Sequence, residues 1–251
     1  MRRHESLHRM RVAVTGGRGL IGGILRDRLS DRFELRLLSR SDADVTDLPA
    51  LERAFAGVDA VVHLAAEASV RAGWDELLPA NVIGAHNAVE AARRAGAERV
   101  VLASSNHVMG MYMWDDDRFA DAAHPAEVGT DEPVRPDSLY GASKAWGEAL
   151  GRLYAERHEM RVVCLRIGWV TEDDQPPATT EWRSEPSHVA RRAPGMWLSH
   201  GDCASLVAAA LSADVVLAIV NGVSDNVGRW FSLAAGRTLL GWEPRRSTVA
   251  R

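Results

Sequence analysis

The sequence predicts an α/β fold built on a parallel sheet with helices on both of its faces. Three observations support this. Short β-branched runs alternate with longer helical stretches from Met10 onward, a glycine-rich turn joins the first run to the first helix, and Gly96 ends a long helical stretch. Parallel strands need crossover connections, which are usually helices, so the alternation favours a parallel sheet.

The elements follow one another at regular spacing. Apolar, β-branched runs predict strands at 11–15, 33–39, 59–65, 99–105 and 161–167. Apolar residues at helical spacing predict helices at 20–29, 48–55, 75–96 and 139–158. The proline-rich stretch 171–195 predicts a loop.

Charge, hydropathy and cysteine content exclude several classes of protein. Thirty basic and thirty-four acidic side chains give a net charge of −4, which is too balanced for an electrostatic nucleic-acid binder. No window approaches the apolar length of a membrane span, and residues 1–10 lack the apolar run of a secretory signal. Cys164 and Cys203 cannot form a disulfide framework, so we expect a cytoplasmic protein. None of the nine histidines has metal-ligand spacing, and no metal is expected.

The turn after the first strand carries a dinucleotide-binding motif. T-G-G-R-G-L-I-G places Gly16, Gly19 and Gly22 at G-x-x-G-x-x-G spacing between a strand and a helix. Glycines there allow a tight turn and let the backbone approach a pyrophosphate at the helix N-terminus. A glycine-rich turn without a ligand is the alternative, but the flanking strand and helix favour a Rossmann-like, doubly wound sheet.

The second strand ends in Ser39 and Arg40 instead of the acidic residue that usually binds the adenosine ribose. A hydroxyl and a guanidinium would bind a 2′-phosphate, which a carboxylate would repel. The pair therefore favours NADP over NAD, although an exposed turn explains Arg40 equally well. Asp44 and Val45 fit either a segment that contacts adenine or a solvated loop.

Tyr140 and Lys144 form a Y-x-x-x-K motif at the start of a predicted helix, so both side chains share one helix face. Tyrosine, with a pKa of about 10, is a poor base at neutral pH, and a nearby ammonium lowers this pKa by stabilising the phenolate. Lys144 is the only lysine among the thirty basic residues, and arginine does not replace a compact ammonium. An incidental pair is the alternative to the catalytic pair that we favour.

Together with V-V-H-L-A-A and the S-S that ends the fourth strand, these motifs resemble the extended short-chain dehydrogenase/reductases of the NAD-dependent epimerase/dehydratase superfamily. Within that superfamily the chain is most similar to uronate dehydrogenases. The strings that carry this likeness are A-S-S-N-H-V-M-G (103–110), R-P-D-S-L-Y-G-A-S-K (135–144), L-R-I-G (165–168), W-L-S-H-G-D (197–202) and L-G-W-E-P (240–244). The likeness covers about residues 10 to 247.

The resemblance implies roles for individual residues. Ser105 matches the serine that hydrogen-bonds the reacting oxygen, Tyr140 the acid/base, and Lys144 the residue that tunes Tyr140 and holds the nicotinamide ribose. The expected cofactor contacts are Gly16, Gly19, Leu20, Ile21, Gly22, Ser39, Arg40, Asp44, Val45, Leu64, Ala65, Ala66, Asn81, Tyr140, Lys144 and Ile167. The expected substrate contacts are Ser69, Ser105, Asn106, His107, Trp169 and Arg192.

Some of these matches leave an alternative open. Arg192 matches the arginine that binds a uronate carboxylate, or else it is a surface arginine beside Arg191. His107 either contacts a sugar hydroxyl or only supports its neighbours. Trp169 stands where the family has a small residue, usually serine, so it either fills the sugar site or turns into the core. The stretch 114–133 carries seven carboxylates and is either a lid that disfavours anionic substrates or, as we favour, a solvated surface loop.

The resulting expectation is an NAD(P)-dependent oxidoreductase acting on a small sugar or sugar acid. It has a polar tail at 1–10, a dinucleotide-binding domain at 11–170 and a small substrate-covering region at 171–251 packed on the same domain. The resemblance implies oxidation of an aldohexuronate at C1 to an aldarolactone, and members of the family commonly form homo-oligomers. The alternatives are a sugar-nucleotide epimerase or dehydratase, which needs room for a nucleoside diphosphate, and a non-catalytic NAD(P)-sensing regulator.

Overall fold

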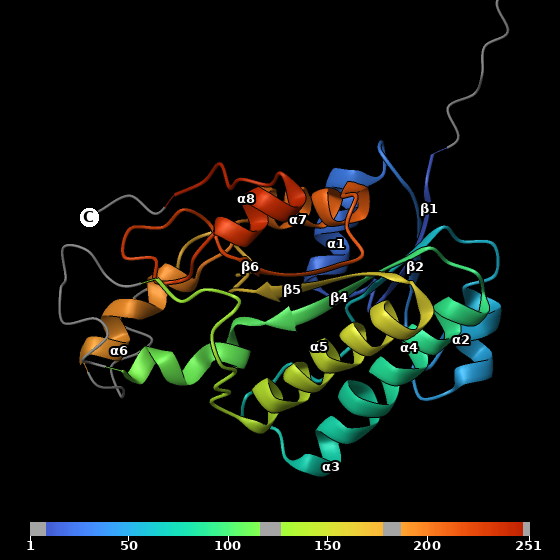
Figure 1. Cartoon of the computed structure of the whole chain (residues 1–251), viewed down its shortest axis with the longest axis horizontal. Coiled ribbons are helices and arrows are strands. Elements are labelled where there is room, and N and C mark those ends of the chain that lie inside the picture. Colours follow the sequence, from blue (N-terminus) through green and yellow to red (C-terminus); the bar gives the residue numbers. More distant parts are fainter. Residues whose placement is uncertain (1–8, 116–126, 178–186, 248–251) are drawn as a thin grey trace, which may run out of the picture.

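A parallel sheet of six strands, in the order β2-β1-β3-β4-β5-β6, runs through the middle of the molecule (Figure 1). The computed structural model describes residues 9–115, 127–177 and 187–247. Its strands are β1 (Arg11–Thr15), β2 (Glu34–Leu38), β3 (Ala60–His63), β4 (Arg99–Ser105), β5 (Arg161–Ile167) and β6 (Leu217–Gly222). The first five begin and end within two residues of the expected strands, whereas no expected strand corresponds to β6.

Helices cover both faces of this sheet, which confirms the doubly wound α/β fold (Figure 1). One face carries α1 (Leu20–Leu29), α7 (His200–Ser212) and α8 (Ala234–Leu240). The other carries α2 (Leu48–Ala54), α3 (Trp74–Leu77), α4 (Gly84–Arg94) and α5 (Leu139–His158). Beyond the carboxyl ends of β4 and β5 lie a 3-10 helix, η2 (Asn106–Trp114), and α6 (Ser187–Arg192), followed by the turn η5 (Ala193–Met196). Within the described ranges, no helix is long and apolar enough to cross a bilayer.

Two expected elements differ from the structure. The helix expected over 75–96 consists of α3, a π-helical turn η1 (Leu78–Ile83) and α4. Pro79, at the start of η1, has no N–H to continue the α-helical ladder, and this accounts for the interruption. The loop expected over 171–195 contains the helical residues of α6 and η5 from Ser187 onward.

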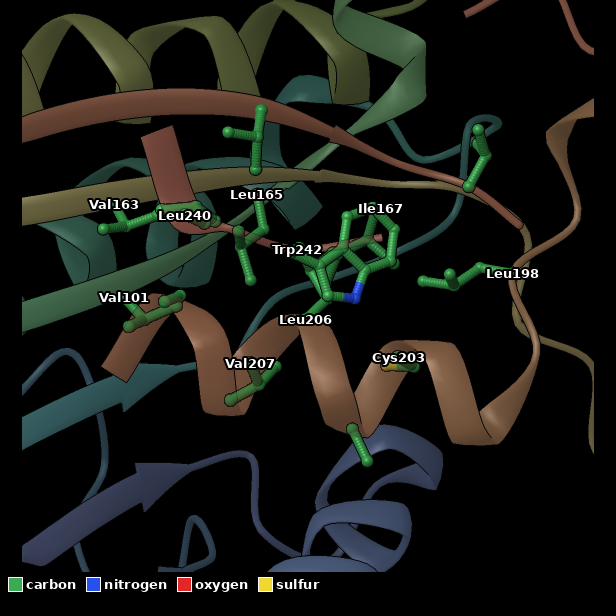
Figure 2. Packing of buried hydrophobic residues seen from close by; sticks show 14 of the residues in the cluster. Val101, Val163, Leu165, Ile167, Leu198, Cys203, Leu206, Val207, Leu240 and Trp242 are labelled. Atoms are coloured by element: carbon green, nitrogen blue, oxygen red, sulfur yellow. The ribbon is translucent and has the colours of Figure 1, made fainter. Parts of the chain in front are cut away.

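The inner strands of the sheet bury both of their faces, as parallel strands between two helical layers do. Figure 2 shows α7 placing Leu206 and Val207 toward Val101 of β4 and the strand β5, with Trp242 in the same cluster. Because α7 and β6 come from the C-terminal region, that region is built onto the same sheet and core as the preceding part of the chain.

The strand order reverses beside β1, and this reversal creates a binding crevice. The chain passes from β1 to β2 on one side and then returns to β3 on the other side of β1. In such sheets, ligands bind beyond the carboxyl ends of the two strands at the reversal. Thr15 and His63 end these strands, and the Thr15 hydroxyl lies 2.8 Å from His63 Nδ1. Burial and the nearby Lys144 charge lower the pKa of His63 to about 3, so its ring is neutral at physiological pH.

Candidate active site

A cavity of about 740 Å³ opens at this reversal and extends across the carboxyl ends of β3, β4 and β5. Most of the site residues predicted from the sequence line it. They are Gly16, Gly19, Leu20, Ile21, Gly22, Leu64, Ala65, Ala66, Ser69, Ser105, Asn106, His107, Tyr140, Lys144, Ile167 and Trp169. The sheet thus brings together segments that lie far apart in the sequence.

The glycine turn at one end of the cavity leaves no room for side chains. Gly16 has a φ of 69°, and a Cβ there would lie 2.8 Å from the backbone nitrogen of Ala65. A Cβ on Gly22 would lie 2.5 Å from the carbonyl oxygen of Gly17. Helix α1 begins at Leu20 without a side-chain cap, so its first N–H groups remain available to an anion. These features fit the pyrophosphate of a dinucleotide.

The turn after β2 contains a carboxylate that the sequence reasoning missed. Asp42 Oδ2 accepts hydrogen bonds from the Ser39 nitrogen at 2.8 Å and the Ser39 hydroxyl at 2.5 Å. These bonds lower the pKa of Asp42, so its carboxylate is ionised in the same turn as the exposed Arg40. Neither Ser39 nor Arg40 lines the cavity itself. The signal in the sequence was Ser39 followed three residues later by aspartate, a spacing typical of a turn.

Asp44 and Val45 also lie outside the cavity lining. The Asp44 carboxylate accepts from the nitrogen and the hydroxyl of Thr46, each at 2.8 Å. The Val45 carbonyl accepts from Asn87 Nδ2 at 3.0 Å, and the Val45 side chain packs where a Cβ on Gly84 would be. The structure therefore anchors this segment on α4, and its contact with adenine stays a prediction.

Tyr140 and Lys144 occupy the first turns of α5, as their spacing predicted. The Ser138 hydroxyl caps this helix by accepting from the Gly141 nitrogen at 3.0 Å. Lys144 Nζ donates to the Ala103 carbonyl at 2.8 Å and lies 5.7 Å from the centre of the Tyr140 ring. The lysine thus links α5 to β4 close to the tyrosine ring.

Burial dominates the acid–base behaviour of this pair. It raises the pKa of Tyr140, and hydrogen bonding with Ser105 opposes that effect. Burial also lowers the pKa of Lys144, to about 8. The sequence led us to expect a lowered pKa for Tyr140 from Lys144 alone, and it carried no information about burial of the phenol. Perturbed pKa values of this kind, grouped in one cavity, are typical of functional sites.

Asn81 lies behind this pair and not in the cavity wall. Its Oδ1 accepts from the Glu67 nitrogen at 2.8 Å, and its Nδ2 donates to the Glu67 carbonyl at 2.9 Å and to the Ser143 hydroxyl at 3.0 Å. The Ser143 hydroxyl in turn donates to the Tyr140 carbonyl at 2.7 Å. The π-helical turn η1 therefore ties the loop after β3 to the helix that carries Tyr140.

His107 has an acidic partner that the sequence did not reveal. Its Nδ1 lies 2.8 Å from Asp137 Oδ2, and its ring meets the Tyr140 ring edge-on at 5.8 Å between centres. Asp137 is close enough only because position 110 is glycine, since a Cβ on Gly110 would clash with the Asp137 carboxylate. The contact with the Asp137 carboxylate therefore holds the His107 ring in place beside Tyr140.

Ser69, Trp169 and Met196 also line the cavity. The Trp169 nitrogen donates to the Met196 carbonyl at 2.8 Å, and the Trp169 carbonyl accepts from the Leu198 nitrogen at 2.9 Å. These bonds hold the chain after β5 against the segment after η5, with Trp169 partly buried in the cavity wall. Asn106 Nδ2 lies 3.0 Å from the Met196 sulfur, a weak acceptor.

The structure does not bring Arg192 to the cavity. Its guanidinium donates to the carbonyl of Met113, and its own carbonyl accepts from Trp230 Nε1 at 3.3 Å. Of the acidic stretch 114–133, residues 116–126 lie outside the described residues, so the choice between a lid and a surface loop stays open. Sequence reasoning also missed Val70, Arg71 and Met196 in the cavity wall.

Comparisons with known proteins show the family to which the chain belongs. The model of the NAD dependent epimerase/dehydratase family matches residues 12–171. An L-arabinose 1-dehydrogenase (NAD(P)(+)) from Haloferax volcanii is 40% identical, over 95% of this chain and 98% of the relative. An NAD-dependent glucose-6-phosphate dehydrogenase from the same organism is 37% identical, over 95% and 94%. A crystal structure of a mutant uronate dehydrogenase from Agrobacterium tumefaciens in complex with NAD superposes with a TM-score of 0.78 at 32% identity, over 96% and 86%.

Proposed function

Because the chain belongs to the NAD dependent epimerase/dehydratase family, we propose that it is an NAD(P)-dependent oxidoreductase that oxidises a free sugar or sugar acid at C1. The observation that carries the proposal is the continuous cavity that joins the glycine turn to Ser105, Tyr140 and Lys144. Its volume of about 740 Å³ lies within the range of small-molecule sites, roughly 300–1,000 Å³.

Each end of the cavity has a separate task in this proposal. The N–H groups at the start of α1 and the glycine turn hold the pyrophosphate, and Lys144 holds the nicotinamide ribose. The bound dinucleotide supplies the acceptor for the hydride that leaves C1. Tyr140, as the phenolate, takes the proton of the C1 hydroxyl, while Ser105 hydrogen-bonds the same oxygen. An aldohexuronate that loses this hydride and proton becomes an aldarolactone.

Polar side chains and one large aromatic ring bear on the choice of substrate. Ser69, Asn106 and His107 line the cavity beside the proposed catalytic residues and offer groups that bind sugar hydroxyls. Trp169 reduces the volume at this end and offers no acceptor from its ring. We therefore propose a small aldose derivative as the substrate, with a sugar acid as the first candidate, and not a sugar nucleotide.

The choice between NAD and NADP depends on the turn after β2. Arg40 is exposed there and suits a 2′-phosphate, which supports a preference for NADP. The ionised Asp42 carboxylate engages the Ser39 hydroxyl in the same turn and works against that preference. The proposed preference for NADP is accordingly modest.

A turnover panel tests the proposed function. Purified protein is given NAD or NADP with neutral aldoses, uronates, sugar phosphates and UDP-sugars, and both reduced cofactor and lactone are measured. We expect reduction with free sugars or sugar acids and lactone in equal amount, abolished in Tyr140→Phe. Interconversion of UDP-sugars without net reduction would instead identify an epimerase. Cofactor binding without turnover of any sugar would identify a nucleotide-sensing regulator.

A further inference from the structure

An arginine, Arg71, lines the cavity and has no role in the reaction described above. Arg71 lies in the loop between β3 and α3, two residues after Ser69. The Ser69 hydroxyl accepts from the Arg71 nitrogen and the Ser69 carbonyl from the Ala72 nitrogen, each at 3.2 Å. This turn places Ser69 and Arg71 together in the cavity wall.

The Arg71 guanidinium is not committed to a protein partner. In the part of the chain that the structure describes, it makes no hydrogen bond or ion pair. The nearest acidic residue along the loop, Glu67, accepts from the Ser69 nitrogen at 3.0 Å instead. Two arginines outside the cavity show the contrast: Arg11 binds Asp59 at 2.7 Å, and the buried Arg166 binds Glu148 at 2.8 Å.

The charges around the cavity favour an anion there. Of the described residues that line it, Arg71 and Lys144 are the cationic ones, and none is aspartate or glutamate. Lys144 is bound to the Ala103 carbonyl beside Tyr140, close to the reacting carbon in the proposed function. Arg192, the arginine expected to bind a carboxylate, is directed to Met113 outside the cavity wall. Arg71 is therefore the one arginine among the described residues that line the cavity.

We propose that Arg71 is a specificity-determining residue that binds an anionic group at the end of the sugar remote from C1. The proposal rests on the proposed function, which places C1 at Tyr140. The planar guanidinium pairs with two oxygens at once, and both a carboxylate and a phosphate present them. Ser69 adds a hydroxyl to the same group or to a neighbouring sugar oxygen.

Kinetics of charge-deletion variants test this role. The rates of oxidation of glucuronate, glucose 6-phosphate and neutral glucose are measured in the wild-type protein and in the variants Arg71→Met and Arg71→Lys. The control variant is Arg157→Met, which removes an exposed arginine at the far end of α5. We expect wild type to prefer one of the two anions. Arg71→Met lowers kcat/KM for that anion about tenfold or more, mainly through KM, because a hydrogen bond to a charged group is lost.

The same variants separate substrate binding from cofactor binding. Arg71→Met leaves the rate with glucose and the KM of the cofactor within about twofold, Arg71→Lys recovers part of the loss, and the control behaves as wild type. Equal losses for neutral and anionic sugars, a raised cofactor KM, or no anion preference in wild type would each overturn the proposal. The glucuronate and glucose 6-phosphate arms show whether the anion is a carboxylate or a phosphate.

A binding measurement distinguishes failure of this inference from failure of the proposed function. The probes are 1,5-anhydroglucitol, its 6-phosphate and 1,5-anhydroglucuronate, which have no C1 hydroxyl to oxidise, and the readout is the thermal unfolding temperature with cofactor present. We expect an anionic probe to raise this temperature in wild type and not in Arg71→Met. Stabilisation without sugar turnover would leave an anion site and reject the oxidoreductase. Turnover with no Arg71-dependent stabilisation by either anion would reject only the role of Arg71.

Discussion

The two ends of the cavity are built in different ways. The cofactor end consists of one continuous turn, from Gly16 to Gly22, and the residues directly after β3. Its shape depends on backbone geometry and on the absence of side chains. The proposed substrate end combines side chains from five separate segments, which are the loops after β3 and β5, the start of η2, the start of α5 and the turn η5.

This difference explains why the sequence predicts the class of cofactor more readily than it predicts the substrate. A backbone turn is specified by residues that are adjacent in the sequence, so its motif reveals its ligand. The substrate end depends on which side chains from distant segments meet, and a single substitution such as tryptophan at position 169 changes its volume and its hydrogen bonds. Experiments that alter one end and leave the other intact test this division.

The largest effect is expected at the junction of the two ends. Tyr140→Phe and Lys144→Arg should keep the fold and lower turnover by roughly 10²- to 10⁴-fold, because proton transfer is lost or badly tuned. Burial raises the pKa of Tyr140. Because the phenolate is the form that accepts the proton in sugar oxidation, we expect the rate to rise with pH. The guanidinium in Lys144→Arg is bulkier and spreads its charge, so it stabilises the phenolate less well. We therefore expect the residual rate of Lys144→Arg to require higher pH than wild type.

Steady-state rates between about pH 6 and 10 measure this prediction, with circular dichroism as the check on folding. Near-normal turnover of Lys144→Arg at neutral pH would contradict the catalytic assignment of the pair.

A change confined to the cofactor end is Gly22→Ala. The added Cβ would lie 2.5 Å from the Gly17 carbonyl oxygen, so the turn must shift, at a cost of about 1–3 kcal/mol in stability. We expect cofactor affinity to fall about tenfold in a fluorescence titration. Gly23→Ala is the matched control, because its Cβ meets nothing within 4 Å and alanine favours the helix. Equal behaviour of the two variants would show that the turn is not tightly packed.

A change confined to the substrate end is Asp137→Asn. Loss of the carboxylate removes the charged partner of His107 Nδ1, and we expect kcat/KM for the sugar to fall about tenfold with cofactor affinity unchanged. Gly110→Ala, which displaces the same carboxylate, should show the same pattern in the same assays. A parallel loss of cofactor affinity would mean that Asp137 supports the fold more broadly than through His107.

Trp169→Ser should have a smaller effect and the opposite sign. Removing the indole restores volume and a hydroxyl in the wall of the substrate end, so we expect a several-fold gain in kcat/KM for glucuronate or galacturonate. Thermal unfolding of the variant controls for damage to the packing against η5. Unchanged kinetics in a folded variant would place the ring away from the bound sugar.

The smallest effects are expected in the turn after β2, which we propose discriminates between NAD and NADP. Arg40→Ala should shift the NADP to NAD ratio of kcat/KM several-fold toward NAD, and Asp42→Asn should shift it toward NADP by removing a charge that repels a 2′-phosphate. Michaelis constants for both cofactors in both variants provide the measurement. Shifts in the same direction would show that one of these side chains does not face the ribose.

Local sequence patterns predicted most of the fold. Strands 99–105 and 161–167 and helix 139–158 agree with the structure residue for residue, since each has a strong apolar pattern. β6 was not predicted, although its first four residues, 217–220, are apolar. The π-helical turn η1 was not predicted because it interrupts an otherwise helical pattern at Pro79.

Most of the candidate site was also predicted, because local sequence motifs specify those residues. Residues within motifs, such as Gly16 and Tyr140, line the cavity as expected. The carboxylates of Asp42 and Asp137 were missed because their importance lies in a partner that only the folded chain supplies. Arg192 was placed by resemblance alone, and a backbone carbonyl outside the cavity engages its guanidinium.

The isolation of Lys144 also has a practical consequence. As the only lysine in the chain, it provides the one side-chain amine that acylating or methylating reagents can label. Its pKa of about 8 leaves it more often uncharged, and therefore more nucleophilic, than an ordinary lysine at mildly alkaline pH. A ¹³C-methyl group attached there would give a single side-chain resonance close to Tyr140. That resonance would report occupancy of the proposed nicotinamide site directly, with no background from other lysines.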